Sequence, residues 1–182
     1  MSSGDKHDRA TLNVSLGIFG LALFLRSSVY SRWLFCAAVG SLAGLVLSPD
    51  LDTHSNSTKR WKSVGLGFVW WAYDTAIPHR SWVSHGPFIG TFLRILYLIG
   101  MYVLLVHLSY WLSLQVDFVS FAWEPDETLG RTLKFVLSIP IDMTLSSFVG
   151  LCLSDVIHII MDVSSTADKK FKRSQKYGKK NW

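Results

Sequence analysis

The chain has 182 residues, of which 49% are hydrophobic and 17% are charged, and it contains eight Trp and eleven Phe. An average soluble domain carries about 25% charged residues, so this composition argues against a soluble enzyme and favours a protein in contact with lipid. The two cysteines have no paired spacing, which argues against a disulfide framework and against a thiolate zinc site.

The net charge of +5 comes from one end of the chain, because seven of the eighteen Lys and Arg residues lie between Lys169 and Lys180. Without them the rest of the chain is slightly acidic. We therefore divide it into a helical membrane domain over residues 1–168 and a basic tail over residues 169–182. Such a tail is typical of a segment that binds anionic lipid, with about 1 kcal/mol from each basic residue, and we do not expect nucleic acid as a partner.

The first two apolar segments, Leu12–Leu25 and Trp33–Leu47, are separated by a short loop with two arginines. Each has about fifteen residues, fewer than the roughly twenty of a straight transmembrane helix, but a tilted helix could still cross. We expect the two segments to form a close helical hairpin. Gly40 and Gly44 lie about one helical turn apart, and this spacing would let another helix backbone approach closely.

After Pro49 the chain becomes polar, and its next apolar segment, from Gly65 to Ile77, has only thirteen residues. This length is too short to cross a membrane, and the segment is rich in Trp and Tyr, which favour the membrane interface. We therefore expect an interfacial or buried helix that ends at Pro78.

The longest apolar segment, Phe88–Leu114, predicts a transmembrane helix. An acidic loop is expected over Gln115–Gly130, followed by a last apolar segment, Phe135–Met161, with a kink at Pro140. The predicted fold class is therefore all-α: a polytopic membrane helical bundle of about four transmembrane helices plus one interfacial helix.

Basic residues predict how this bundle is oriented. They are concentrated in the tail and in the segment that contains Lys59 and Arg60, whereas the 115–130 loop has none. Because Lys and Arg favour the cytoplasmic side, both termini and residues 48–87 are expected to be cytoplasmic. Arg26 and Arg32 oppose this orientation, since it places their loop outside.

Five of the six histidines fall on that one side of the predicted membrane. His158 and Asp162 are four residues apart on a helix, so both side chains can bind one ion, and Asp155 lies on the same face. The segment after Pro49 is expected to be a turn or extended, so alternate side chains share a side. We therefore predict a metal site with ligands among His7, Asp50, Asp52, His54, His79, His85, His158 and Asp162.

The donor types indicate which metal and which chemistry the site would support. Imidazole and carboxylate without thiolate suit zinc first, with manganese or iron as alternatives, and favour a catalytic over a structural site. In a catalytic site, Asp52 or Asp155 could act as the general base. Arg80 could stabilise the negative charge that develops on a phosphoryl group.

Several blocks of sequence resemble a known family. They are SGDKHDRAT at Ser3–Thr11, SPDLDTHS at Ser48–Ser55, KRW at Lys59–Trp61, HRSWVSHGP at His79–Pro87, and the HxxxD that begins at His158. Together they resemble the YdjM-like predicted membrane-bound metal-dependent hydrolases, and more closely short cyanobacterial membrane proteins described only as metal-binding. The resemblance implies a divalent metal, hydrolysis, and a bacterial inner or thylakoid membrane.

A more distant resemblance is to the zinc-dependent phospholipases C and the single-strand-specific zinc nucleases, which hydrolyse phosphodiesters. These enzymes share the order of an N-terminal His, an Asp-rich loop, further His residues and a helical HxxxD. No second HxxxE pair follows here, so the sequence supports one or two metal ions and not three.

Three functions remain open at this point. The first is a metal-dependent hydrolase of phosphate esters, such as lipid headgroups, at the membrane surface. The second is a non-catalytic membrane factor in which a structural metal site supports binding of a protein partner. The third is a small transporter with His107, Asp142 and Asp74 along its path.

Overall fold

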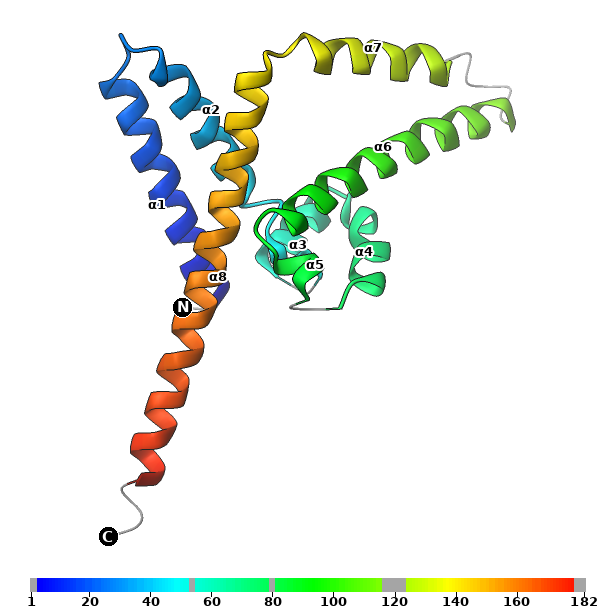
Figure 1. Ribbon diagram of the computed structural model, residues 1–182. Coiled ribbons are helices and arrows are strands. Elements are labelled where there is room, and N and C mark those ends of the chain that lie inside the picture. Colours follow the sequence, from blue (N-terminus) through cyan, green and yellow to red (C-terminus); the bar gives the residue numbers. More distant parts are fainter. Residues whose placement is uncertain (1–2, 53–54, 79–80, 116–123, 179–182) are drawn as a thin grey trace.

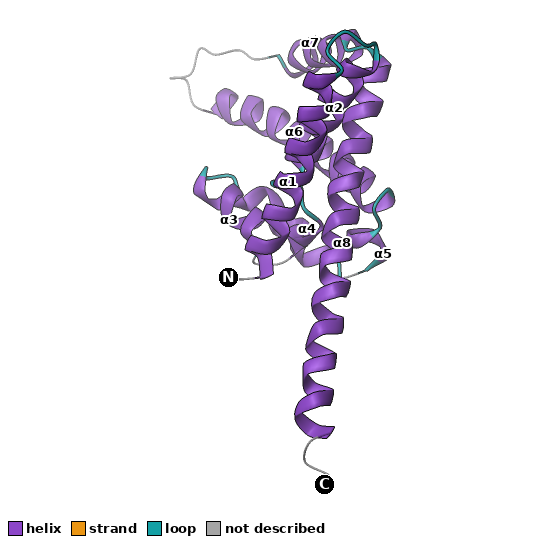
Figure 2. Ribbon diagram, turned by 90° about the vertical axis from the view of Figure 1, so that its left-hand side faces the viewer, coloured by secondary structure: helices purple, strands orange, loops and turns teal. Residues whose placement is uncertain are grey.

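A computed structural model describes the chain except for residues 1–2, 53–54, 79–80, 116–123 and 179–182, and every regular element in the described part is helical (Figures 1 and 2). The all-α prediction is therefore confirmed. The elements in chain order are α1 (Ser3–Phe24), α2 (Tyr30–Ala43), the 3-10 helix η1 (Pro49–Asp52), α3 (Asn56–Ser63), the 3-10 helix η2 (Gly67–Trp70), α4 (Trp71–Ala76), α5 (Trp82–His85), α6 (Ile89–Gln115), α7 (Pro125–Ser138) and α8 (Ile141–Gly178).

Two of the described helices, not the predicted four, are long and apolar enough to cross a membrane. They are α6 and the part of α8 from Ile141 to Gln175. α2 has 14 residues, a rise of about 21 Å, which is shorter than the roughly 30 Å hydrocarbon core. α1 has 22 residues, but its first turns are polar, so its apolar part is short. The prediction of four transmembrane helices is therefore wrong by length and composition.

The predicted hairpin of α1 and α2 is confirmed, and it lies along α8 (Figure 1). Inside the hairpin, the buried hydroxyls of Ser15 and Ser41 are 2.8 Å apart. At the loop end, Asp142 at the start of α8 accepts a hydrogen bond of 2.8 Å from Trp33 Nε1 and pairs with Arg32 at 3.2 Å. The hairpin is thus attached to α8 where α8 begins.

Small residues allow α2 and α8 to pack with their backbones in contact. A methyl group built on Gly40 would overlap the Ser147 carbonyl, and one built on Gly150 would overlap the Ala37 carbonyl. One turn along, Gly44 lies directly against the Ser154 side chain. The close approach predicted for Gly40 and Gly44 is therefore confirmed, and α8 is the helix that approaches.

The segment predicted as an interfacial or buried helix is divided into η2 and α4, and it packs against α6. Trp70, Tyr73 and Leu51 are at most 2% exposed and form an apolar core with Tyr97 of α6. Neighbouring aromatic rings in this core have centroids 5.3–5.5 Å apart, a favourable distance for edge and tilted contacts. Because Leu51 belongs to η1, this core also fixes the position of Asp50.

The predicted acidic loop over Gln115–Gly130 is helical from Pro125 onward, and its residues 116–123 lie outside the described part of the chain. Helix α7 begins at Pro125, which occupies a first-turn position where proline needs no amide hydrogen, and it carries Asp126 and Glu127 near its start. Pro140 separates α7 from α8, so the expected kink is a complete break between two helices. α8 then continues as one helix through the basic tail to Gly178.

Candidate metal centre

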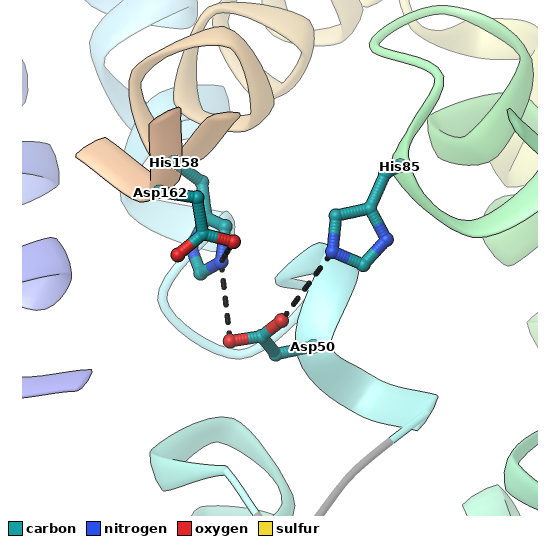
Figure 3. Close-up of side chains that lie close together, drawn as sticks. All are labelled: Asp50, His85, His158 and Asp162. Carbon is teal, nitrogen blue, oxygen red and sulfur yellow. Dashed lines mark ion pairs between the residues drawn. The ribbon is translucent and has the colours of Figure 1, made fainter. Parts of the chain in front are cut away.

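Three separate elements bring four potential metal ligands together. Asp50 lies in η1, His85 ends the short helix α5, and His158 and Asp162 lie one turn apart on α8. One donor atom from each of the four lies within 4.8 Å of the others (Figure 3). All four are among the eight ligands predicted from the sequence.

The Asp50 carboxylate lies between two imidazole rings (Figure 3). Its Oδ2 is 3.1 Å from His158 Nε2, and its Oδ1 is 3.5 Å from His85 Nε2. His158 Nε2 is also 4.0 Å from Asp162 Oδ2. Ligand atoms about 2.1 Å from a tetrahedral zinc ion are about 3.4 Å from one another, so the spacings of 3.1 and 3.5 Å are close to this value and the spacing of 4.0 Å is somewhat wider.

The surroundings of Asp50 determine its charge. Burial alone would raise the pKa of the Asp50 carboxyl, but hydrogen bonds and the positive charge of His158 and His85 outweigh it and hold that pKa well below its usual range. Asp50 is therefore ionised. It brings a negative charge next to the second carboxylate, Asp162, in a site that is mostly shielded from water.

His7, from the start of α1, adds a third imidazole at the edge of the cluster. Its Nε2 is 3.5 Å from Asp162 Oδ1, and its ring centroid is 4.3 Å from that of His158 in an edge-on arrangement. Burial and the neighbouring His158 lower the pKa of His7, which favours the neutral imidazole that binds metals. The predicted ligand His7 thus lies beside the cluster and contacts two of its members, Asp162 and His158.

Of the other predicted site residues, the structure describes the side chain of Asp155. His54, His79 and Arg80 fall outside the described residues, as does the side chain of Asp52, so their roles stay predictions. Asp155 is described, and its buried carboxylate pairs with Arg94 of α6 instead of joining the four donors.

Sequence reasoning did not identify Arg94 as part of this region, although a lone arginine within the apolar 88–114 segment was visible. The available signal was its position, because a charged side chain in such a segment needs a buried partner.

The three residues considered for a transport path are engaged separately. His107 is exposed on α6 and its Nδ1 is 2.8 Å from the Val103 carbonyl of the same helix. Asp142 binds Arg32 and Trp33 at the start of α8, and Asp74 is exposed on α4. These positions do not favour the transporter hypothesis.

A cleft of about 610 Å³ opens beside the cluster, between the 81–87 turn and α8. His85 and Asp162 form part of its wall, so two of the four donors can be reached from it. Its other walls are mainly apolar, from Pro87, Ile159 and Val163, and its lining also includes Lys170. The cleft could therefore hold a molecule with an apolar part and an anionic group next to the metal ligands.

Comparison with known proteins supports metal binding. Residues 2–172 match the family described as "Uncharacterized metal-binding protein (DUF2227)". An uncharacterized protein of Aquifex aeolicus (strain VF5) is 33% identical over 138 residues, which are 73% of this chain and 92% of the relative. No solved structure matches the chain. These matches give no support to the YdjM-like hydrolases in particular.

Proposed function

Because the chain belongs to the family of uncharacterized metal-binding proteins, DUF2227, we propose that Asp50, His85, His158 and Asp162 bind one divalent metal ion. The observation that carries this proposal is the convergence of four donors within 4.8 Å. Two imidazoles and two carboxylates suit zinc first, with manganese or iron as alternatives. His7 supports the site through its contact with Asp162.

The proposed reaction is hydrolysis of a phosphate ester attached to an apolar part, such as the headgroup phosphate of a lipid. A divalent ion, when bound, would supply Lewis acidity toward a phosphoryl oxygen and toward water. The chain would supply the binding surface: Pro87, Ile159 and Val163 for the apolar part, and Lys170 for negative charge. Asp52 remains the candidate general base and Arg80 the candidate for stabilising developing charge.

The reaction would take place at a membrane surface. Large apolar side chains are exposed along the helices that surround α8, among them Leu16, Phe24 and Phe35, and on α8 itself at Leu145 and Val149. Exposed apolar surface of this extent is typical of contact with lipid. The start of α1 lies beside the cluster on α8, which supports both termini on one side, and we propose the cytoplasmic side of a bacterial inner or thylakoid membrane.

The test is a metal and activity assay on purified protein. Wild type should contain about one zinc, manganese or iron per chain by elemental analysis, and should hydrolyse phosphodiesters or phosphomonoesters in detergent or in vesicles of anionic phospholipid. Removal of the ion by a chelator should abolish turnover, and return of the ion should restore it. A protein that contains no divalent metal after purification and takes up none would contradict the proposal.

A variant in the cleft tests the proposed substrate side. Lys170→Ala is expected to raise KM for an anionic amphiphilic ester about five-fold, equivalent to about 1 kcal/mol, because one positive charge leaves the cleft. Metal content should stay unchanged. Lys172→Ala is the matched control, since Lys172 pairs with Asp168 at 2.8 Å and is not part of the cleft lining. Equal KM values for the two variants would remove Lys170 from the substrate site.

A structural metal is the second candidate, because four protein donors are enough to fill a tetrahedral coordination sphere. In that case the ion would join η1, α5 and α8, and a protein partner would bind elsewhere. Fully metallated wild type without turnover, combined with a large fall in thermal stability on chelation, would favour this function over hydrolysis.

A further inference from the structure

Arg94 is a fully buried arginine in the apolar helix α6 and contacts two other elements. Its Nη2 forms an ion pair with Asp155 Oδ2 of α8, and both side chains are at most 1% exposed. The Thr91 hydroxyl, one turn earlier on α6, also hydrogen-bonds this carboxylate. The charge is therefore compensated inside the protein, as a buried ion must be.

The second arm of the guanidinium reaches toward the metal cluster. Arg94 Nη1 donates to the Ser84 carbonyl at 3.3 Å, and the buried Ser84 hydroxyl is 2.8 Å from His85 Nδ1. The same carbonyl is approached closely by α6, because a methyl group on Gly90 would lie 2.7 Å from it. Ser84, the residue next to the ligand His85, is thus held against α6.

Ser84 can also select the tautomer of His85. Its hydroxyl lies 3.3 Å from the Ser81 carbonyl and can donate there. The hydroxyl oxygen then accepts Nδ1–H of His85, which leaves the lone pair on Nε2, the nitrogen that faces Asp50 at 3.5 Å. Ligand histidines are commonly oriented in this way by a hydrogen bond to the other ring nitrogen.

The ion pair between Arg94 and Asp155 also fixes where the two ligands on α8 lie relative to His85. Asp155 precedes His158 by three residues and Asp162 by seven, so all three lie on one face of α8. Arg94 therefore joins the helix face that carries two ligands to the turn that carries a third.

We propose that Arg94, Asp155 and Ser84 are positioning residues that set the geometry of His85 at the metal centre. The inference rests on metal binding by the four residues, as proposed above, and it gives Asp155 a role that acts through Arg94.

The first test is Ser84→Ala, which removes the hydroxyl and leaves the ion pair intact. Its affinity for Zn²⁺ should fall at least about ten-fold, the loss typical when a ligand's hydrogen-bonding partner is removed, and the visible spectrum of the Co²⁺-substituted protein should shift. Ser15→Ala is the matched control, since Ser15 is also buried and bonded to a serine on the neighbouring helix but lies outside the cluster. Ser15→Ala should change neither the affinity for Zn²⁺ nor the spectrum of the Co²⁺-substituted protein.

The second test replaces the buried pair by apolar residues, Arg94→Met together with Asp155→Leu, because such replacements often preserve folding. The folded double variant should bind Zn²⁺ at least about ten-fold more weakly and show an altered Co²⁺ spectrum. Arg32→Met with Asp142→Leu is the control, since it removes another pair between helices, at the far end of the hairpin.

Wild-type affinity and wild-type Co²⁺ spectra in Ser84→Ala would overturn the inference even if the double variant failed to fold. The same measurements distinguish a failure of this inference from a failure of the proposed function. If wild type binds no metal, the proposed metal centre is wrong; if wild type and Ser84→Ala bind metal equally, only the positioning role is wrong.

Discussion

Replacement of His158 by alanine is expected to lower the affinity for Zn²⁺ by about 100-fold or more. His158 Nε2 is 3.1 Å from Asp50 and 4.0 Å from Asp162, so its ring occupies the middle of the donor cluster. Loss of a direct ligand should exceed the 10- to 100-fold loss typical of a residue that only supports one. The measurement is competition with a chromophoric chelator, with elemental analysis of the purified variant.

His107→Ala is the matched control for this prediction. His107 also lies on a long apolar helix, but its ring is exposed and bonded to the Val103 carbonyl one turn earlier. Its replacement should leave metal content and affinity at wild-type values. Full metal content in His158→Ala, with an unchanged dissociation constant, would mean that the ion binds elsewhere or that His158 only pairs with Asp50.

Gly40→Val is expected to destabilise the protein by about 3 kcal/mol. Any side chain at Gly40 would overlap the Ser147 carbonyl, so α2 and α8 would have to move apart along their contact. Forcing extra groups into a packed contact costs about 1–3 kcal/mol, and here the opposing group is rigid backbone. For a chain of this size the loss corresponds to a fall in melting temperature of roughly 10 °C, measured by circular dichroism in detergent.

Gly100→Ala provides the comparison, because among the described residues no atom of another element lies within 4 Å of a methyl group built at Gly100 on α6. Alanine favours helix over glycine by up to about 1 kcal/mol, so this variant should be as stable as wild type or more stable. A melting temperature for Gly40→Val equal to that of Gly100→Ala would show that the backbones of α2 and α8 are not in contact.

Local patterns predicted the parts of this protein that depend on neighbouring residues. Continuous apolar segments located the long helices, the spacing of Gly40 and Gly44 indicated a close helix contact, and the HxxxD of His158 and Asp162 indicated one side of a metal site. Each of these signals spans one or two helical turns, within which geometry is fixed by the helix itself.

Contacts between distant parts of the chain were less accessible. The number of spanning helices was overestimated because the apolar segment Trp33–Leu47 extends beyond the end of α2 at Ala43, so apolar length exceeded helix length. The start of helix α7 was not predicted, because its first residues are acidic and were assigned to a loop. Acidic residues also favour the N-terminus of a helix. The partner of Arg94 is 61 residues away, and only folding shows that it is Asp155.

The unbroken course of α8 restricts how the protein can meet a charged surface. The helix extends beyond the rest of the described structure (Figures 1 and 2), and Gly178 lies about 24 Å of helical rise past Asp162. At physiological ionic strength the attraction between charges decays over about 8 Å. If α8 is perpendicular to an anionic bilayer, the bilayer charge can therefore act on the donor cluster or on the far end of the basic tail. It cannot act on both. A tilted α8 would bring both near the headgroups, so the tilt of this one helix couples the charge of the lipid to the position of the metal centre.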